Sequence, residues 1–400
     1  MATVRYHSLD ALRGTMMLLG IYLHAAVAYS RHGSWPWKDG STTGVFDLTL
    51  GLIHVFRMPV FYCLAGFFAA FLLEHRGTAG FLKNRMVRIL VPFAAGWAVL
   101  FPLVAALTTT AMNLEEPAVI PVKYLQFFSS GEVLRHLDPM HLWFLEYLLI
   151  FYAVAVVASP LARRLPSVVA GLERSFRVVV TSPLGPLVLA AVTFPALCFM
   201  QEGALDDPSG FVPEARILVT YLVFFASGWL LHRNADLLQS LPRLRRAATS
   251  LVLGLAAAFL GFYFIWQSSQ SAGSRASVSF LGSAWFLGLS VWLFIFGFIG
   301  IFLRLLERPV PWIRYLSDSS YWLYLVHMPV ILVFQIAVAG TGWPPGVKAL
   351  VVLAASVPTL LASYHLFVRF TWIGAILNGR RHPIKRRPTL GAAAQPGWQK

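Results

Sequence analysis

Apolar residues form ten long runs along the chain, and a polar or basic segment separates each run from the next. The runs cover residues 9–29, 45–73, 89–109, 141–160, 183–201, 214–232, 249–268, 281–303, 315–338 and 347–370. A helix needs roughly 20 apolar residues to cross a membrane, and in lipid it satisfies its own backbone hydrogen bonds. The pattern therefore predicts an all-α, polytopic integral membrane bundle of about ten transmembrane helices. The run at 183–201 is the least regular, because it contains Pro183, Pro186 and Pro195.

Lys and Arg residues collect in alternate connecting segments. The segments before run 1, after run 10, and between runs 2 and 3, 4 and 5, 6 and 7, and 8 and 9 hold twenty-two of them. The opposite side holds five, namely Arg31, Lys38, Lys123, Arg135 and Arg275. Because cytoplasmic segments carry the excess of Lys and Arg, we expect both termini in the cytoplasm. Residues 1–377 are expected to form the transmembrane domain, and residues 378–400 a basic, disordered cytoplasmic tail close to anionic lipid.

The composition agrees with a membrane protein. Of the 400 residues, 58% are hydrophobic and 12% are charged, and the net charge is +15. Soluble domains carry roughly twice that share of charged residues. Topology alone explains the positive charge, so we expect no nucleic-acid partner. Cys63 and Cys198 lie in apolar runs, and the chain lacks the residue spacing of a zinc site, so we expect no disulfide framework and no metal.

The first run carries three ionisable residues, Asp10, Arg13 and His24. On a helix, residues eleven positions apart differ by roughly 20° and rise ~16 Å, so Arg13 and His24 share one face. Asp10 precedes Arg13 by three residues and can pair with it. Ionisable groups are costly in hydrocarbon unless they are paired or hydrated, so they mark candidate functional sites. An interfacial salt bridge, with His24 simply packed in the bundle, is an equal alternative for this helix alone.

Cations continue in the second run and in the segment that follows it. His54 and Arg57 face the same way, and Arg57 lies too deep to reach the interface easily. An ion pair with an acid on another helix is the structural alternative for Arg57. Arg85 and Arg88 lie one turn apart next to Lys83, and two guanidinium groups on one face suit a phosphate. Ordinary cytoplasmic anchoring explains that pair at least as well.

Two further runs contribute polar side chains. His141 and Glu146 open the fourth run at the outer interface. Ser320, Tyr324 and His327 form one face of the ninth run, and this face is equally suited to hydrogen bonding between helices. Because each polar face would be costly in lipid, we expect the faces to share one hydrated interior. Such an interior agrees with an enzyme or a transporter, and the residues alone do not separate the two.

Five motifs, in the same order, resemble those of the membrane acyltransferase-three family. The first is Ser8-Leu9-Asp10-Ala11-Leu12-Arg13-Gly14 with the family's spacing of Arg, ten residues and His, which Arg13 and His24 match. The others are Arg85-Met86-Val87-Arg88, Phe56-Arg57-Met58-Pro59, His141-Leu142-Trp143-Phe144-Leu145 and Tyr321-Trp322-Leu323-Tyr324-Leu325-Val326-His327-Met328-Pro329. The resemblance spans roughly residues 5–370. Within the family, the chain looks most like the glucan biosynthesis protein C branch, which is associated with succinyl transfer to periplasmic glucans.

Two features depart from the family pattern. The second helix of the family often ends Ser-Gly-Phe, whereas this chain has Ala65-Gly66-Phe67 and lacks the hydroxyl. Unlike the two-domain branch of the family, this chain is expected to have no extracytoplasmic hydrolase domain after the tenth run. Both departures leave the acceptor open.

The resemblance implies a multi-pass O-acyltransferase of the bacterial inner membrane. It would move an acyl group, such as succinyl or acetyl, from cytoplasmic acyl-CoA to a hydroxyl of an extracytoplasmic glycan such as a periplasmic glucan. Acyl-CoA is then a co-substrate, no metal or redox cofactor is implied, and a homodimer is one option for the assembly. The competing hypotheses are a proton-coupled transporter or flippase and a non-catalytic scaffold.

The hypothesis assigns a role to each polar residue. His24 acts as the general base or carries the acyl group, Arg57 stabilises the oxyanion, and Arg13 with Asp10 holds the first helix in place. The donor phosphates would be held by Arg85, Arg88 and Lys83. The acceptor cavity would be lined by His54, His141, Glu146, Tyr324 and His327.

Overall fold

The computed structural model describes residues 6–33, 35–241, 243–270, 275, 277–306, 308, 310–379 and 382–383. Regular structure in these ranges is entirely helical, which confirms the predicted all-α fold. The α-helices are α1 (His7–Val27), α2 (Gly44–Arg85), α3 (Val91–Met112), α4 (Ile120–Ser129), α5 (Trp143–Arg164), α6 (Pro166–Thr181), α7 (Gly185–Leu197), α8 (Ala215–Arg233), α9 (Leu237–Ser240), α10 (Leu244–Gln270), α11 (Val278–Leu305), α12 (Pro311–Ala339), α13 (Pro345–Ser363) and α14 (Trp372–Asn378). Short 3₁₀ turns are η2 (Pro117–Val119), η3 (Glu132–Arg135) and η4 (Met140–Leu142), and π-helical turns are η1 (Met86–Leu90) and η5 (Tyr364–Val368).

Each of the ten predicted runs contains a helix. Seven described stretches are long and apolar enough to cross a membrane, and the first of them, Gly44–Met112, contains both α2 and α3. In the least regular run, α7 has 13 residues, or ~20 Å, which is short for a crossing. The number of crossings and the cytoplasmic termini stay predictions. Most of the predicted tail, residues 384–400, lies outside the described residues, and Asn378 still belongs to α14.

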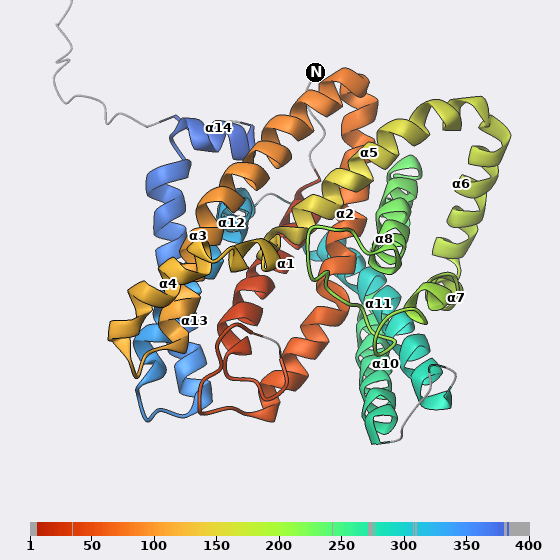
Figure 1. Ribbon diagram of the computed structural model, residues 1–400. Helices are drawn as coiled ribbons and strands as arrows, with labels where there is room; N and C mark the ends of the chain where they lie inside the picture. Colours follow the sequence, from red (N-terminus) through yellow and green to blue (C-terminus); the bar gives the residue numbers. More distant parts are fainter. Residues whose placement is uncertain are drawn as a thin grey trace, which may run out of the picture.

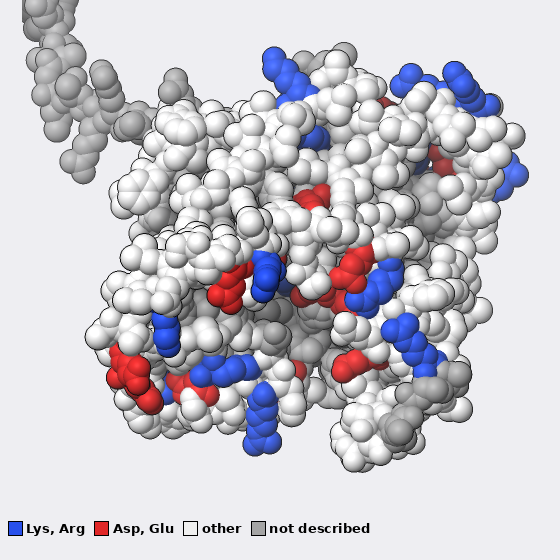
Figure 2. All heavy atoms as spheres, in the orientation of Figure 1, with Lys and Arg blue, Asp and Glu red and all other residues white. Residues whose placement is uncertain are grey.

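The first helix, α1, lies inside the bundle. It packs against α2, α11, α12 and α13 (Figure 1). The start of α1 and the short helix α14 lie at the same end of the molecule, at the top of Figure 1. Blue side chains predominate along that edge in Figure 2, as expected for a cytoplasmic end. The polar face of α1 is therefore directed at other helices rather than at lipid.

Two glycines bring α2 and α8 into close contact. A Cβ atom on Gly66 would collide with the Phe225 carbonyl, and one on Gly228 would collide with the Cys63 carbonyl. Small residues of this kind let membrane helices approach closely. Farther along, α2 bends at Gly77, whose φ of 63° suits glycine. The segment that carries Arg85 therefore begins a new direction beyond the membrane-spanning part of α2.

Candidate active site

Three histidines from different elements meet in the interior. They are His24 of α1, His141 of η4 and His327 of α12. The ring centroids of His24 and His327 are 5.0 Å apart, and those of His141 and His327 are 4.8 Å apart. His141 and His327 are buried, with 8% and 3% of their surfaces exposed. We call these three residues the histidine cluster. Their rings lie together, whereas one hydrated interior shared by all the polar faces stays a prediction.

Backbone contacts fix the ring orientation of two members of the cluster. His141 Nε2 donates to the Leu325 carbonyl (3.0 Å), and His327 Nδ1 donates to the Tyr324 carbonyl (2.7 Å). The Tyr324 hydroxyl donates to the His141 carbonyl (2.7 Å). His141 Nδ1, His327 Nε2 and His24 Nδ1 are buried without a hydrogen-bond partner among the described residues. Buried polar atoms are rarely left unpaired, so these nitrogens mark a place for a substrate group or water.

The guanidinium group of Arg57 lies beside α1, one turn before His24. A Cβ atom added to Gly20 would collide with a terminal nitrogen of Arg57. Arg57 Nε is buried without a partner among the described residues, and no described carboxylate forms an ion pair with this side chain. The structural ion pair considered for Arg57 is thus not formed within the described part of the chain. A fixed cation next to the histidine cluster is well placed to stabilise a developing oxyanion.

Gly20→Ala is expected to lower kcat for the reaction that the family resemblance implies by about 10- to 100-fold, because the methyl group would push the guanidinium of Arg57 away from α1. The colliding atom is the end of a flexible side chain, so the fold should be retained. Initial-rate kinetics of the purified variant measure the effect. Gly96→Ala is the matched control, since a Cβ atom there makes only ordinary contacts, of 3.8 Å or more. Equal rates for both variants would contradict this placement of Arg57.

A second polar region lies between the histidine cluster and the end of the bundle where α1 begins. We call it the cytoplasmic cavity, because that end of the bundle is the one predicted to face the cytoplasm. Its volume is about 250 Å³. Residues of α1, α2, η1, α5, α12 and α14 line it, among them Arg13, Asn84, Arg85, Arg88 and Tyr152. Three arginines and no acid are among the lining residues, so the cavity is suited to an anion.

Arg85 and Arg88 differ in their contacts. The guanidinium carbon of Arg85 lies 4.4 Å from the ring centroid of Tyr152, and Arg85 Nε has no described hydrogen-bond partner. Arg88 donates from Nε and a terminal nitrogen to the Leu377 carbonyl of α14 (3.2 and 2.8 Å). Asn84 Oδ1 is also buried and unpaired among the described residues. The unpaired atoms of Arg85 and Asn84 indicate that the cavity accepts a polar ligand.

Three aromatic side chains, which we call the aromatic layer, separate the cytoplasmic cavity from the histidine cluster. They are Phe61, Phe144 and Tyr324, with ring centroids 5.2 Å apart for Phe61 and Phe144 and 6.1 Å apart for Phe144 and Tyr324. Phe61 and Phe144 line the inner end of the cavity, whereas no member of the histidine cluster lines it. On α1 and α12 the nearest lining residues, Met17 and Tyr321, precede His24 and His327 by seven and six residues, which is roughly two helical turns.

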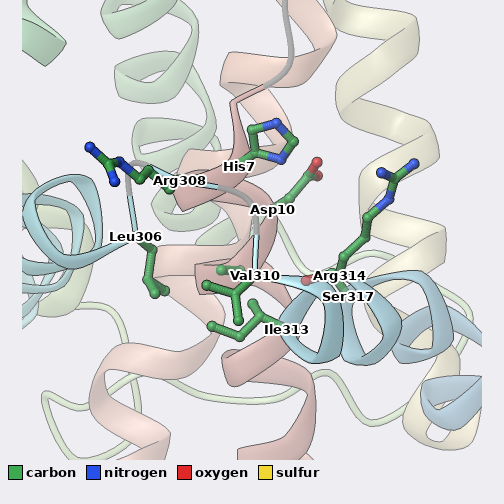
Figure 3. A pocket seen from close by; sticks show the side chains of 9 residues that line it. His7, Asp10, Leu306, Arg308, Val310, Ile313, Arg314 and Ser317 are labelled. Carbon is green, nitrogen blue, oxygen red and sulfur yellow. The ribbon is translucent and has the colours of Figure 1, made fainter.

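Asp10 and Arg13 connect the first helix to its surroundings at the end of the bundle where α1 begins. Arg13 pairs with Asp10 (3.2 Å), as their spacing predicted. Asp10 also lines a pocket of about 20 Å³, where it lies between His7 and Arg314, while the Arg308 side chain extends away (Figure 3). That pocket has room for about one water molecule. Asp10 and Arg13 thus anchor α1, and Arg13 also contributes charge to the cytoplasmic cavity.

Three predicted site residues lie apart from these two regions. His54 Nε2 donates to the Leu205 carbonyl (2.8 Å) in a separate cavity of about 450 Å³ between α2, α10, α11 and the loop after α7. Burial raises the pKa of Asp206 in the same cavity wall, despite its ion pair with Arg216. Glu146 has one unpaired carboxylate oxygen and no hydrogen bond to the described residues of the cluster. Lys83 is exposed and is not among the cavity-lining residues.

The sequence interpretation missed several residues of the site. Asn84 and Tyr152 line the cytoplasmic cavity, and Trp35 and Gln335 lie beside His24. The adjacency of Asn84 to Arg85 was a usable signal. A long-range contact such as that between Gln335 and the end of α1 leaves no periodic pattern in the sequence.

Comparison with known proteins gives a match over most of the chain. The acyltransferase domain family matches residues 6–368. The glucans biosynthesis protein C of Salmonella typhimurium is 24% identical over 406 residues, covering 97% of this chain and 98% of that protein. The proteins of the same name from Salmonella paratyphi B and Salmonella gallinarum are 25% identical over 341 and 347 residues, covering 82% of this chain and 83% of each relative. No solved structure matches the chain.

Proposed function

The chain belongs to the acyltransferase family that matches residues 6–368, and from that premise we propose that it moves an acyl group from cytoplasmic acyl-CoA to a hydroxyl of an extracytoplasmic glycan. Family membership confirms the prediction of a multi-pass membrane acyltransferase. The relatives are named for glucan biosynthesis, which supports a glucan as the acceptor. We propose that this glucan is periplasmic and that the protein lies in the bacterial inner membrane.

The cytoplasmic cavity is the proposed donor site. Arg85 and Arg88 would pair with donor phosphates, and Arg13 adds positive charge to the same wall. At about 250 Å³, the cavity is near the lower end of known ligand sites, which span roughly 300–1,000 Å³. The pantetheine arm would therefore occupy it, with the nucleotide at its mouth. The side chains of the aromatic layer must rotate away from their present positions for the thioester to reach His24.

The histidine cluster is the proposed reaction site, and the observation that carries the proposal is the unpaired imidazole of His24 next to the guanidinium of Arg57. The acceptor oxygen attacks the thioester carbonyl carbon as His24 removes the hydroxyl proton. Arg57 stabilises the negative charge that develops on the carbonyl oxygen. The carbon–sulfur bond then breaks, and the proton passes from His24 to the departing thiolate. The ester and free CoA are the products.

Acyl transfer in a defined membrane tests the proposal. The purified protein in proteoliposomes receives radiolabelled succinyl-CoA or acetyl-CoA on the donor side, and a periplasmic glucan extract on the other side. We expect label in the glycan fraction as a base-labile ester, together with release of CoA. Entry of an intact solute without label transfer would support the transporter hypothesis instead.

A further inference from the structure

The side chain of Gln335 on α12 joins three parts of the structure next to His24. Gln335 is fully buried, and its amide nitrogen donates to the carbonyls of His24 (3.0 Å) and Ala25 (3.3 Å). Its amide oxygen accepts from the indole nitrogen of Trp35 (3.2 Å). One side chain therefore links α12 to both the end of α1 and the loop that follows it.

The contacts of Gln335 complete the end of α1. The last four carbonyls of a helix lack partners within the helix. In α1 the carbonyl of Ala26 accepts a hydrogen bond from the backbone nitrogen of Tyr29, and the carbonyl of Val27 accepts one from that of Ser30. The amide nitrogen of Gln335 donates to the other two carbonyls, which are those of His24 and Ala25. Since His24 lies in this last turn, the position of Gln335 determines where the backbone of His24 lies relative to α12.

Trp35 covers the ring of His24. The two ring centroids are 5.2 Å apart with an angle of 32° between the planes, and His327 contacts the same imidazole at 5.0 Å. The imidazole is therefore in contact with two rings that come from separate elements. Trp35 also packs against the small apolar cluster that Val104 of α3 forms with Met328 and Leu332 of α12, so its position is set by the bundle as well as by the loop.

The loop that carries Trp35 is held by a buried ion pair. Lys348 of α13 lies 2.8 and 2.9 Å from the two carboxylate oxygens of Asp39, and both side chains are almost fully buried. Lys38, the preceding residue, donates to the carbonyls of Val27 and Ser30. These contacts fix both the start and the middle of the loop, so Trp35 has a defined place above His24.

We propose that Gln335 and Trp35 are positioning residues for His24. Gln335 sets the backbone of His24, and Trp35 restricts the rotation of its imidazole and shields it from the outer side. The inference rests on the proposed role of His24. Neither residue need touch the reacting atoms, so their loss should act on turnover rather than on donor binding.

Kinetics of Gln335→Met and Trp35→Ala test the inference. We expect kcat to fall by about 100-fold in each, since a displacement of ~1 Å has effects of this size, while KM for the donor stays within about twofold. Trp35→Phe keeps a ring over His24 and should restore kcat to within about fivefold of the wild type. Trp343→Ala removes an exposed tryptophan from the loop before α13 and should leave both parameters unchanged.

A chemical readout separates positioning from general stability. After treatment with diethyl pyrocarbonate, mass spectrometry measures how fast His24 itself is modified. We expect modification in Trp35→Ala to be at least about fivefold faster than in the wild type, because the cover is removed. If Gln335→Met does not fold, this rate and the kinetics of the two Trp35 variants decide the question.

The outcomes distinguish this inference from the proposed function. A kcat within threefold of the wild type in Gln335→Met and Trp35→Ala, or an unchanged rate of His24 modification in Trp35→Ala, overturns the positioning role. Full activity of His24→Ala overturns the proposed function instead.

Discussion

His24→Ala is expected to lower kcat for acyl transfer by about 10²- to 10⁴-fold, the range by which a general base accelerates a reaction. The imidazole carries an unpaired buried nitrogen and lies between Trp35 and His327, near the cation of Arg57. Without it, the acceptor hydroxyl has no base at this position. Donor affinity should stay within about twofold, because His24 does not line the cytoplasmic cavity. Single-turnover kinetics with labelled acyl-CoA measure the first quantity, and equilibrium binding of CoA measures the second.

His75→Ala is the matched control for that substitution. His75 is also a histidine of a long membrane helix, but it is exposed at the cytoplasmic end of α2 and contacts the Phe71 carbonyl of its own helix. Its loss should change kcat by less than about twofold. If His24→Ala retains more than a tenth of the wild-type kcat, His24 is not the base, and the histidine cluster has a structural role only.

The Arg85→Ala/Arg88→Ala double variant is expected to raise the Kd for CoA by about 100-fold or more. A hydrogen bond to a charged group contributes about 1.5–3 kcal/mol, so two of them correspond to roughly 10²- to 10⁴-fold. Arg85→Ala alone should account for most of the change, because Arg85 has an unpaired nitrogen whereas Arg88 already binds the Leu377 carbonyl. Isothermal titration of the protein in nanodiscs with CoA measures both variants.

Charge loss elsewhere on the cytoplasmic end is the control for this effect. Arg76→Ala removes an exposed cation from α2 outside the cavity wall, and its Kd should stay within about threefold of the wild type. Raising the salt concentration should weaken CoA binding in the wild type more than in the double variant, because fewer charge pairs remain to be screened. An unchanged Kd in the double variant would exclude the cytoplasmic cavity as the phosphate site. The same titration of Lys83→Ala tests whether the donor site extends beyond the cavity.

Helix periodicity explains why part of the site was predictable. A repeat of 3.6 residues converts sequence spacing into a shared face, so the Asp10–Arg13 pair and the inward direction of His24 and His327 followed from position alone. The requirement that polar groups avoid lipid predicted that these faces point inward. It did not predict that the aromatic layer would separate the arginine-lined cavity from the histidine cluster. The same reasoning did not apply to His54, whose partner is the Leu205 carbonyl in a long loop.

Loops and partial helices limited the prediction. The path of residues 28–33 and 35–43 depends on the ion pair between Asp39 and Lys348, which are far apart in the sequence. The position of Trp35 over His24 could therefore not be predicted. The length of α7 could likewise not be predicted from the sequence, because the apolar run continues beyond Leu197, where the helix ends. The amphipathic helix α6 was absent from the ten runs, since only one of its faces is apolar.

The aromatic layer has a consequence for the membrane as a whole. A protein that accepts reactants from both sides of an energised membrane must not become a path for protons, because the ion gradient would then be lost. Phe61, Phe144 and Tyr324 lie between the arginines of the cytoplasmic cavity and the imidazoles of the histidine cluster. Close-packed rings at this place exclude the continuous chain of water molecules that proton conduction requires. The proposed acyl transfer to an acceptor on the other side is then compatible with a permeability barrier that stays intact between turnovers.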